Sequence, residues 1–544
     1  MTDPGSTAAK EKTQVFTARR IITMTGERPE AFAVRGAWVV ATGGLGDLRG
    51  QFPGAYVRSF GDTTVTPGFN DAHQHPTIIA EQSLQVDLSP GQIASSRDLT
   101  AALRRRAAQA PAGSWIIGCG YDPFRSNRGA DLTRADLDAA CPDHPVLVVH
   151  VTLHTGVVNS RGLALAGLRG PADAPSGGML DTDAAGQLNG VLHDQALYDL
   201  AFPAFTQRET VIPPPSPDDL RRAFESFQAR LHAAGITSVG DALVGRDGWE
   251  LLRLLETSGR LTVRVNALAS YDHFGYFRAL PDIAAPPGSR LRVGGVKAFA
   301  DGAVNGGTCL VEEPVTGRND HGLERVSPDE LKDIVREVHD AGWRACIHAN
   351  GDRAIRYVLD AVSLAQQRSP RADPRHRIEH TSLVDAGIIG RMRELGVVAV
   401  PFANYALAHG DKLRGFYGTS RTEWMFAHRA MLDAGIPVAG SSDYPCGPYE
   451  PLFAMQSCVT RQDREGAAFG SSQRITAAEA LALYTTGSAY ASAEEQTKGR
   501  LAAGCLADFV VLGQDPLAVD AAKLADIPVL QTWVGGVPVW SADA

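Results

Sequence analysis

The 544-residue sequence lacks several features that would place it in a specialised class of protein. Its seven cysteines are odd in number and never form a Cys-x-x-Cys pair, which argues against a disulfide framework and a thiolate zinc site. It has no run of about 18 apolar residues, and residues 1–16 are polar, so neither a membrane span nor a secretory signal is expected. We therefore expect a soluble, cytoplasmic protein without a membrane partner.

The sequence also has no tract rich in Lys and Arg that could neutralise a row of phosphates. It contains 52 Lys and Arg against 61 Asp and Glu, a formal net charge of −9, which makes nucleic acid an unexpected partner. Hydrophobic residues make up 44% and charged residues 21%, as in globular proteins, and the length predicts more than one core. We expect a small-molecule partner and leave a homo-oligomer open.

Both ends of the chain consist of short apolar stretches broken by Gly and Pro, a pattern typical of small antiparallel strands. We predict that residues 1–64 and 497–544 meet in one composite β-domain. Between them, strand-like and helical segments alternate, which predicts an α/β domain over residues 65–496. The strand candidates are residues 65–75, 236–242, 261–269, 291–302, 344–350, 376–382, 397–404 and 436–445.

Eight β/α units in succession are typical of a TIM-type (β/α)8 barrel. An open doubly wound sheet is the alternative, but no G-x-G-x-x-G motif follows a first strand. The first two strand candidates are separated by far more residues than a crossover helix needs. We predict that this stretch, residues 76–235, is an insertion that forms a subdomain at one end of the barrel and caps its mouth.

Side chains with metal-binding chemistry lie at or near the carboxyl ends of five strand candidates. His73 and His75 are two residues apart, so on a strand both imidazoles face the same way. Each residue alone is more easily explained as structural, but barrel enzymes gather catalytic groups at this end. Imidazole and carboxylate ligands suit Zn²⁺, with Mn²⁺, Co²⁺ or Ni²⁺ as alternatives. The full set is His73, His75, Lys297, His348, His380 and Asp443.

A series of motifs along nearly the whole chain carries a family resemblance. The motifs are TPGFNDAHQH (66–75), HTGVVNSRGLAL (154–165), GVKAFADG (295–302), HANGDRA (348–354), RIEHTSLV (377–384) and GSSDYPCGPYEPL (440–452). In this order they resemble the amidohydrolase superfamily, and more closely its amidohydrolase-3 branch, which includes N-substituted formamide deformylase. The resemblance implies a TIM barrel joined to a small β-sandwich that both chain ends form.

The resemblance also implies roles for the metal-binding set. His73, His75 and Asp443 would hold one metal, His348 and His380 a second, and a carboxylated lysine at position 297 would bridge them. The cofactor would then be two Zn²⁺ ions, whereas the residues alone leave one or two metals open. Asp443 would be the catalytic proton carrier. Asp71 shares a strand face with His73, so it either orients a ligand from behind or is simply satisfied by backbone.

The sequence says less about the substrate. The binding candidates are His154 and Asn159 in the insertion motif, together with Trp115 and Asn404. Members of the branch carry a His near position 404 and a Ser-x-x-Ser-Arg-Thr stretch where this chain has AVNGGT (303–308). The resemblance therefore does not specify the substrate.

We predict a metal-dependent amidohydrolase that cleaves an amide-type C–N bond, such as that of an N-formyl or N-acyl amine. One alternative is a deaminase or cyclic-amide hydrolase on the same scaffold, although mononuclear deaminases of the superfamily generally lack the bridging Lys. Another is a non-catalytic scaffold protein, but such a protein is expected to have lost ligands, and this chain retains the complete set.

Overall fold

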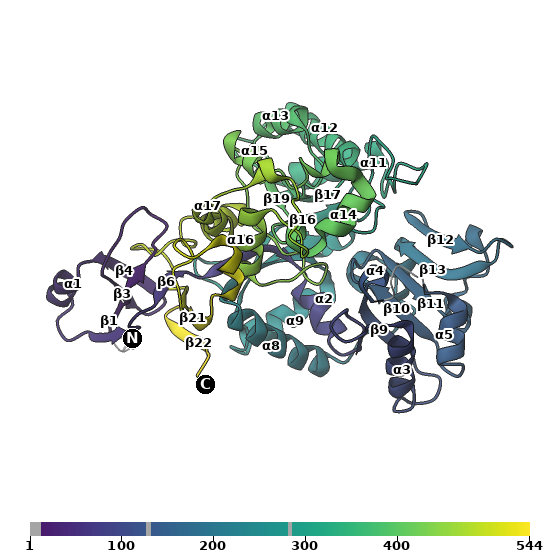
Figure 1. Ribbon diagram of the computed structural model, residues 1–544, viewed down its shortest axis with the longest axis horizontal. Coiled ribbons are helices and arrows are strands. Elements are labelled where there is room, and N and C mark those ends of the chain that lie inside the picture. Colours follow the sequence, from purple (N-terminus) through teal and green to yellow (C-terminus); the bar gives the residue numbers. More distant parts are fainter. Residues whose placement is uncertain (1–11, 127–131, 281–284, 544) are drawn as a thin grey trace, which may run out of the picture.

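The computed structural model describes residues 12–126, 132–280 and 285–543. Within these residues the strands form four sheets. A central α/β barrel lies between two smaller β-rich parts, with the insertion at one end of the long axis and the strands from both chain ends at the other (Figure 1). The first 11 residues of the predicted terminal domain fall outside the described residues.

The central sheet contains seven parallel strands, which join in the order β19-β18-β17-β16-β15-β14-β7. Most of their side chains are buried on both faces, as expected when helices surround a parallel sheet. The structure is thus a mixed α/β fold with a nearly closed parallel barrel. The strands are β7 (Phe69–Gln74), β14 (Ile236–Val244), β15 (Arg264–Ser270), β16 (Leu291–Phe299), β17 (Ala345–Ala349), β18 (Arg377–His380) and β19 (Val398–Pro401).

The eighth strand candidate, residues 436–445, forms isolated bridges instead of a regular strand. On one side the Ala439 amide donates to the Ala399 carbonyl at 3.0 Å, and on the other the Ala72 amide donates to the Gly440 carbonyl at 3.0 Å. The segment therefore lies between β19 and β7. A Cβ atom on Gly440 would lie 2.7 Å from the Tyr484 ring, so this close packing requires glycine.

Helices surround the barrel, and their starts are encoded locally. Ser216 and Ser327 each cap a helix whose first residue is Pro, and each accepts a hydrogen bond from an acidic residue's amide three positions later. The main helices are α8 (Pro217–Ala233), α9 (Arg246–Thr257), α11 (Pro328–Asp340), α12 (Asp352–Arg368), α13 (Ala386–Leu395), α14 (Tyr405–Thr422), α15 (His428–Asp433), α16 (Pro451–Thr460), α17 (Ala477–Ala482) and α18 (Ser488–Ala491).

The insertion contains a six-stranded sheet of its own, in the order β12-β13-β11-β10-β9-β8. The last part of the predicted insertion forms α8, which packs against α2 and leads into barrel strand β14. The sheet strands are β8 (Val86–Asp87), β9 (Ile116–Tyr121), β10 (Val146–His150), β11 (Thr155–Val158), β12 (Gly178–Thr182) and β13 (Leu188–Asp194). Its helices are α2 (Pro76–Gln82), α3 (Ser96–Ala107), α4 (Pro123–Ser126), α5 (Arg134–Ala140), α6 (Ser160–Ala166) and α7 (Gln195–Ala201).

Both ends of the chain contribute strands to the remaining two sheets. The four-stranded sheet, β4-β3-β1-β5, comes from the first 60 residues, whereas the five-stranded sheet, β2-β6-β20-β21-β22, combines both ends. Phe16 and Phe32 from the first sheet and Phe509 and Trp533 from the second form one aromatic core. The strands are β1 (Gln14–Thr17), β2 (Arg20–Ile21), β3 (Ala31–Arg35), β4 (Trp38–Gly43), β5 (Tyr56–Ser59), β6 (Thr64–Pro67), β20 (Phe509–Leu512), β21 (Val529–Val534) and β22 (Val537–Ser541).

None of the helices in the described part of the chain combines the length and the apolar character that crossing a membrane would require.

Candidate metal centre

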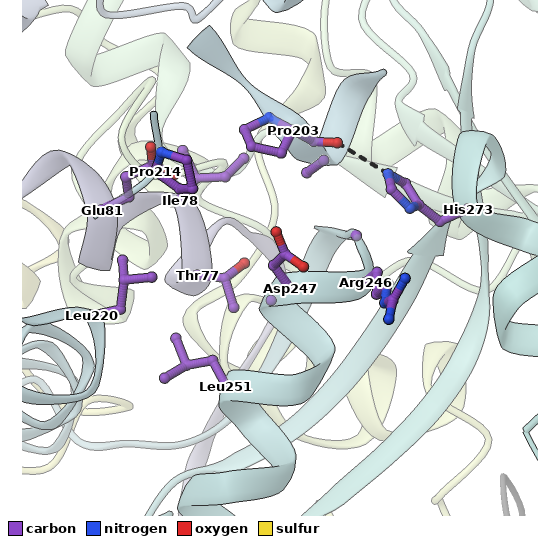
Figure 2. A pocket seen from close by; sticks show the side chains of 13 residues that line it. Thr77, Ile78, Glu81, Pro203, Pro214, Leu220, Arg246, Asp247, Leu251 and His273 are labelled. Atoms are coloured by element: carbon purple, nitrogen blue, oxygen red, sulfur yellow. Dashed lines mark hydrogen bonds between the residues drawn. The ribbon is translucent and has the colours of Figure 1, made fainter. Parts of the chain in front are cut away.

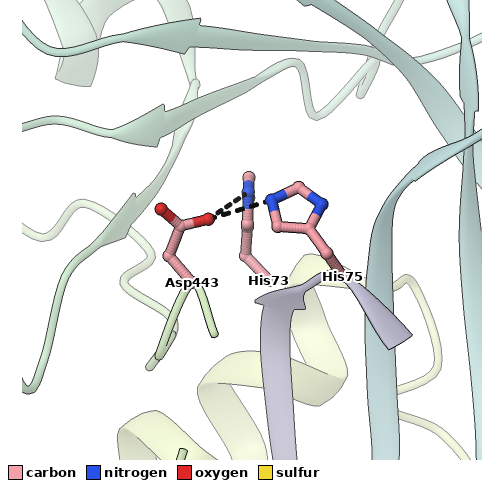
Figure 3. A group of neighbouring side chains, drawn as sticks. All are labelled: His73, His75 and Asp443. Atoms are coloured by element: carbon pink, nitrogen blue, oxygen red, sulfur yellow. Dashed lines mark hydrogen bonds and ion pairs between the residues drawn. The ribbon is translucent and has the colours of Figure 1, made fainter. Parts of the chain in front are cut away.

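Three side chains at the carboxyl end of the barrel converge on one point. One Asp443 oxygen, Oδ1, lies 3.3 Å from His73 Nε2 and 3.1 Å from His75 Nε2. One ligand atom from each residue lies within 4.8 Å of the other two, close enough for a single ion. Figure 3 shows the other carboxylate oxygen of Asp443 turned away from both rings. The two histidines come from the end of β7, and Asp443 comes from the segment that lies between β19 and β7.

The other three members of the predicted set lie beside this trio. Lys297 Nζ is 3.4 Å from His73 Nε2. The His380 ring lies 4.7 Å from the His73 ring and 4.5 Å from the His348 ring, centroid to centroid. All six side chains are buried. The structure therefore brings together at one site six residues that span 371 positions of the sequence, from 73 to 443.

Two of these residues adopt the left-handed backbone conformation that side chains other than Gly rarely occupy. The φ angle is +73° at His380 and +52° at Asp443. Each such residue costs about 1–3 kcal/mol, and such strain concentrates at functional sites. Here the strain occurs where the chain leaves β18 and where it leaves the segment next to β7. The backbone thus turns sharply at the point where each side chain joins the cluster.

Glu379 and Arg377 hold His73 from behind. The His73 Nδ1 atom contacts Glu379 Oε2, and Arg377 binds both oxygens of that carboxylate at 2.7 and 2.8 Å. All three side chains are at most 1% exposed. Glu379 accepts a hydrogen bond from Nδ1 of His73, and this turns Nε2 of His73 toward Asp443 and Lys297. Carboxylates usually orient metal-binding imidazoles in this way.

Two further carboxylates hold the loops that carry the ligand candidates. Asp71 accepts from the His73 amide at 3.2 Å and from the Ser442 amide at 3.1 Å, so it braces the backbone beside His73 and Asp443. Asp301 accepts from the amides of Asn350 and Gly351 just after His348. Burial raises the pKa of both carboxyl groups to about 7. Asp71 thus acts on the backbone next to the ligand candidates and not on an imidazole ring.

Burial disfavours the charged form of four nitrogen groups of the cluster, those of His75, Lys297, His348 and His380. It lowers the pKa of His75 to about 4 and those of His348 and His380 well below their ordinary value. Burial also lowers the pKa of Lys297 to about 8. For Asp443 burial acts in the opposite direction, but the His380 ring and the hydrogen-bonding rings of His73 and His75 hold its pKa well below the usual value. Neutral imidazoles beside an ionised carboxylate are the protonation states that metal binding requires.

An unpaired atom of the cluster also fits a metal site. Nδ1 of His380, whose ring lies beside the His73 and His348 rings, is buried and hydrogen-bonds to no residue that the structure describes. Leaving a buried polar atom without a partner costs about 1–3 kcal/mol. Imidazole nitrogen, carboxylate oxygen and lysine together make a donor set that suits zinc and its neighbours in the periodic table. The residues present therefore fit a divalent transition metal.

Comparison with known proteins agrees with this geometry. The amidohydrolase family model matches residues 61–540. The chain belongs to the amidohydrolase family. It is 30% identical over 523 residues to N-substituted formamide deformylase of Arthrobacter pascens, an alignment that covers 93% of this chain and 94% of the relative. The family and the donor set together indicate a metal-dependent hydrolase.

Solved structures resemble the whole chain. An uncharacterized metal-dependent hydrolase from Pyrococcus furiosus is 26% identical with a TM-score of 0.72, over 93% of this chain and all of the other. One from Pyrococcus horikoshii is 22% identical with a TM-score of 0.75, over 94% and 99% of the two chains, and this likeness supports the fold.

In this amidohydrolase, the insertion reaches the cluster through His154. Its ring lies 5.2 Å from the His348 ring, and its Nδ1 is 2.6 Å from Asp194 Oδ1. Asp194 has a φ angle of +46° and also accepts from the Tyr198 hydroxyl at 3.3 Å. His154 is therefore a predicted substrate-binding residue that does lie next to the metal cluster.

The other three predicted substrate-binding residues have different surroundings. Asn159 is fully buried in the insertion and caps α6, with its side chain bonded to backbone groups of residues 144, 146 and 162, so no substrate can reach it. Trp115 packs in the insertion core against α6. Asn404 donates to the carbonyls of Ser442 and Pro448, so it holds the loop around Asp443. Asn159 and Trp115 thus have structural contacts, whereas Oδ1 of Asn404 is buried without a hydrogen-bond partner among the described residues, so substrate binding by Asn404 stays a prediction.

The sequence reasoning missed Glu379, Arg377 and Asp194. A signal for the first two existed, because a Glu and an Arg two positions apart in a strand of a fully buried sheet must share a face and pair. No comparable signal marks Asp194, because it meets His154 only through the pairing of β11 with β13.

A small cavity near α2 lies apart from these contacts (Figure 2). Its volume is about 80 Å³, and it is lined by Thr77, Leu251 and His273 among others. The His273 ring contacts the Pro203 carbonyl at 3.0 Å. Pockets for small molecules usually have volumes of about 300–1,000 Å³, so this cavity is too small for a substrate.

Proposed function

We propose that the protein hydrolyses an amide-type C–N bond, with an N-formyl or N-acyl amine as the substrate and two divalent metals, in the first place zinc, as the cofactor. The convergence of His73, His75 and Asp443 with Lys297, His348 and His380 carries the proposal. The likeness to N-substituted formamide deformylase supports the choice of bond.

We assign the metal-holding roles as follows. His73, His75 and Asp443 would hold one ion, and His348 and His380 would hold the other. Lys297 would bridge the two ions as a carbamate. Burial favours this modification because only the neutral amine adds CO₂, and the pKa of Lys297 is lowered to about 8. Bound ions would lower the pKa of a water molecule toward neutrality and polarise the scissile carbonyl.

Asp443 is the residue that we assign to proton transfer. One of its oxygens faces His73 and His75, and the other is turned away from them (Figure 3). Its low pKa keeps the carboxylate ionised at neutral pH, and the proton of the attacking water is assigned to this carboxylate. It then delivers that proton to the departing nitrogen, which matters because an amine leaves far more easily than its anion.

His154 is positioned to contact the substrate from the insertion side. Asp194 holds its Nδ1, which leaves Nε2 to hydrogen-bond with the substrate amide. The insertion also excludes bulk water from the site, and this strengthens the electrostatic interactions there.

A hydrolysis screen tests the proposed function. Zinc-loaded protein is incubated with N-formyl and N-acyl amines, and also with aminopurines, aminopyrimidines and cyclic amides. We expect amine release from the first group and its loss on chelation. Turnover of only the second group would replace the proposal with a deaminase or cyclic-amide hydrolase. Absence of both bound metal and any turnover would indicate a scaffold protein.

A further inference from the structure

A cavity of about 610 Å³ lies between the insertion and the barrel. One wall consists of side chains from β9 to β13 of the insertion sheet, and the other consists of the loop after β16 together with α14. Its volume is within the range of about 300–1,000 Å³ that is typical for small-molecule sites. The cavity is therefore large enough for the part of a substrate that does not react.

Two short chain segments connect this cavity to the metal cluster. Thr155 lines the cavity and directly follows His154, whose ring is 5.2 Å from the His348 ring. Asn305 lines it too and comes three residues after Gly302, whose carbonyl is 3.1 Å from His348 Nε2. Because successive Cα atoms are about 3.8 Å apart, Asn305 lies within about 11 Å of Gly302, Cα to Cα. The cavity and the cluster are therefore neighbours, which is the arrangement that a substrate reaching from one to the other needs.

Asn305 lines the cavity and carries buried polar atoms without a hydrogen-bond partner. Its side chain is 1% exposed, and neither Nδ2 nor Oδ1 hydrogen-bonds to any described residue. Burial of an unpaired amide is unfavourable, so the position favours a ligand that bonds to it. Asn305 lies in AVNGGT, the stretch where this chain departs from the branch it resembles.

Lys412 on α14 places a positive charge in the same cavity. Its ammonium group lies 5.7 Å from the Phe124 ring and 5.9 Å from the Phe416 ring, and both rings line the cavity. Its carboxylate partner, Asp122, is 3.5 Å away, which is long for an ion pair, and Asp122 also accepts from the Phe124 amide at 3.0 Å. An ammonium group has three donors, so Lys412 can bind a second acceptor.

The remaining charged groups of the lining already have partners, which leaves Lys412 as the cation with a long ion-pair distance. Arg318 pairs with Asp320 at 3.0 Å. Asp181 is the carboxylate of the lining, and it faces His193 with 3.1 Å between Oδ2 and Nε2. Val148, Val157 and the two Phe rings supply an apolar surface between the polar groups. The lining is thus suited to an apolar body that ends in an acceptor-rich group.

We propose that this cavity binds the distal part of the substrate and that this part is an aromatic or aliphatic body ending in a carboxylate, which Lys412 and Asn305 bind. The inference rests on the proposed function and narrows its substrate to amides with a carboxylate remote from the scissile bond. Lys412 provides charge-assisted hydrogen bonds, and Asn305 provides an N–H donor. Both residues determine specificity and have no part in the proton transfer.

A matched substrate series tests the inference through turnover. Three N-acyl amines share one body and differ at the far end, which is a carboxylate, a carboxamide or a methyl group. We expect zinc-loaded protein to show at least about tenfold higher kcat/KM for the carboxylate than for the carboxamide. Lys412→Met should abolish that ratio, Lys412→Arg should retain part of it, and Asn305→Ala should reduce it. Lys332→Met is the control, because Lys332 pairs with Asp329 on the surface of α11.

A binding experiment separates this inference from the proposed function. Calorimetry on chelated protein compares 4-phenylbutyrate with 4-phenylbutanamide, which removes any contribution of metal to carboxylate binding. We expect tighter binding of the butyrate, at least about tenfold weaker binding in Lys412→Met, and no change in Lys332→Met. Carboxylate binding without hydrolysis of any amide would refute the proposed function and retain the subsite. Equal binding of both probes, or an unaltered Lys412→Met, would overturn the inference, and circular dichroism verifies that each variant folds.

Discussion

The barrel side and the insertion side of the site are held in different ways. On the barrel side His73 contacts Glu379, which Arg377 binds through both oxygens, and all three side chains are fully buried. On the insertion side His154 is held by Asp194, a residue of the insertion itself. His73 is thus held by strands of the central sheet. The position of His154 instead depends on how the insertion packs against the barrel.

The insertion is joined to α14 by side chains. Arg125 donates to Asp411 at 2.7 Å and to the Ala408 carbonyl at 2.9 Å, and Lys412 faces Asp122 at 3.5 Å. Such pairs contribute much less than a packed strand does, because solvent screens the more exposed ones. Under the proposed roles, metal binding therefore depends on the barrel and substrate recognition depends on the insertion. Variants on the barrel side should change the metal and the chemistry, whereas variants on the insertion side should change turnover alone.

The largest effect is expected for Asp443→Asn on the barrel side. The Asn amide can still offer an oxygen to a metal, but it cannot accept or deliver a proton. General acid–base catalysis contributes about 10²–10⁴-fold, and the loss in kcat should exceed that range because in the proposed mechanism one carboxylate serves both transfers and also binds metal. Steady-state kinetics and metal analysis of the purified variant measure the two effects.

Comparing an anilide with an alkylamide that has the same acyl group tests the proton-transfer role of Asp443. Aniline leaves more easily, so the anilide should lose less activity in Asp443→Asn. Equal losses for both substrates would show that Asp443 acts as a ligand only. Asp433→Asn is the control, because Asp433 forms an exposed ion pair with Arg429 on α15.

Glu379→Gln should weaken metal binding without removing a ligand candidate. The neutral amide orients His73 less firmly and leaves the Arg377 charge buried without a carboxylate. We expect about 10–100-fold lower metal affinity, measured by competition with a chelator, and partial recovery of activity at high zinc concentration. Glu225→Gln is a control, because Glu225 also forms ion pairs, with Arg221 and Arg260, but is partly exposed. Unchanged affinity would show that Glu379 does not orient a ligand.

Asp194→Asn tests the insertion side of the comparison. Without the carboxylate, His154 loses a charge-assisted hydrogen bond, so kcat/KM should fall about tenfold. Metal content should remain that of the unaltered protein, because the ligand candidates all belong to the barrel. Asp199→Asn on α7, the helix that begins directly after Asp194, is the control, since Asp199 pairs with the exposed Arg208. Loss of metal in Asp194→Asn would show that the insertion also contributes to metal binding.

The smallest effect is expected in how the free energy of unfolding of metal-free protein depends on pH. Folded His75 titrates near pH 4, whereas an unfolded His titrates near about 6.5. Between these values the unfolded chain binds a proton that the folded chain does not. The free energy of unfolding should therefore fall as the pH drops from about 6.5 to about 4, by up to about 1.4 kcal/mol per pH unit for this group.

Urea unfolding of chelated protein at several pH values measures this slope. His75→Asn removes the group and should give a shallower slope over the same range. An unchanged slope in that variant would show that His75 is not held neutral by its surroundings.

The sequence allowed much of the central fold to be predicted. Seven of the eight strand candidates became β7 and β14 to β19, because buried parallel strands are continuous apolar runs bounded by capped helices. The eighth candidate did not form a regular strand, since its pairing depends on β7 and β19 and on the close contact of Gly440 with Tyr484. Local patterns predict an element but not the neighbours that complete it.

The sequence by itself determined the family and the chemical types present at the site, because the motifs that carry His73, His75, Lys297, His348, His380 and Asp443 can be read along the chain. Only the tertiary structure decided how these residues are held. The contact of Glu379 with His73, the contact of Asp194 with His154 and the cavity between Asn305 and Lys412 all join segments far apart in the sequence. No periodicity encodes them, since each depends on the folding of the barrel and on the placement of the insertion against it.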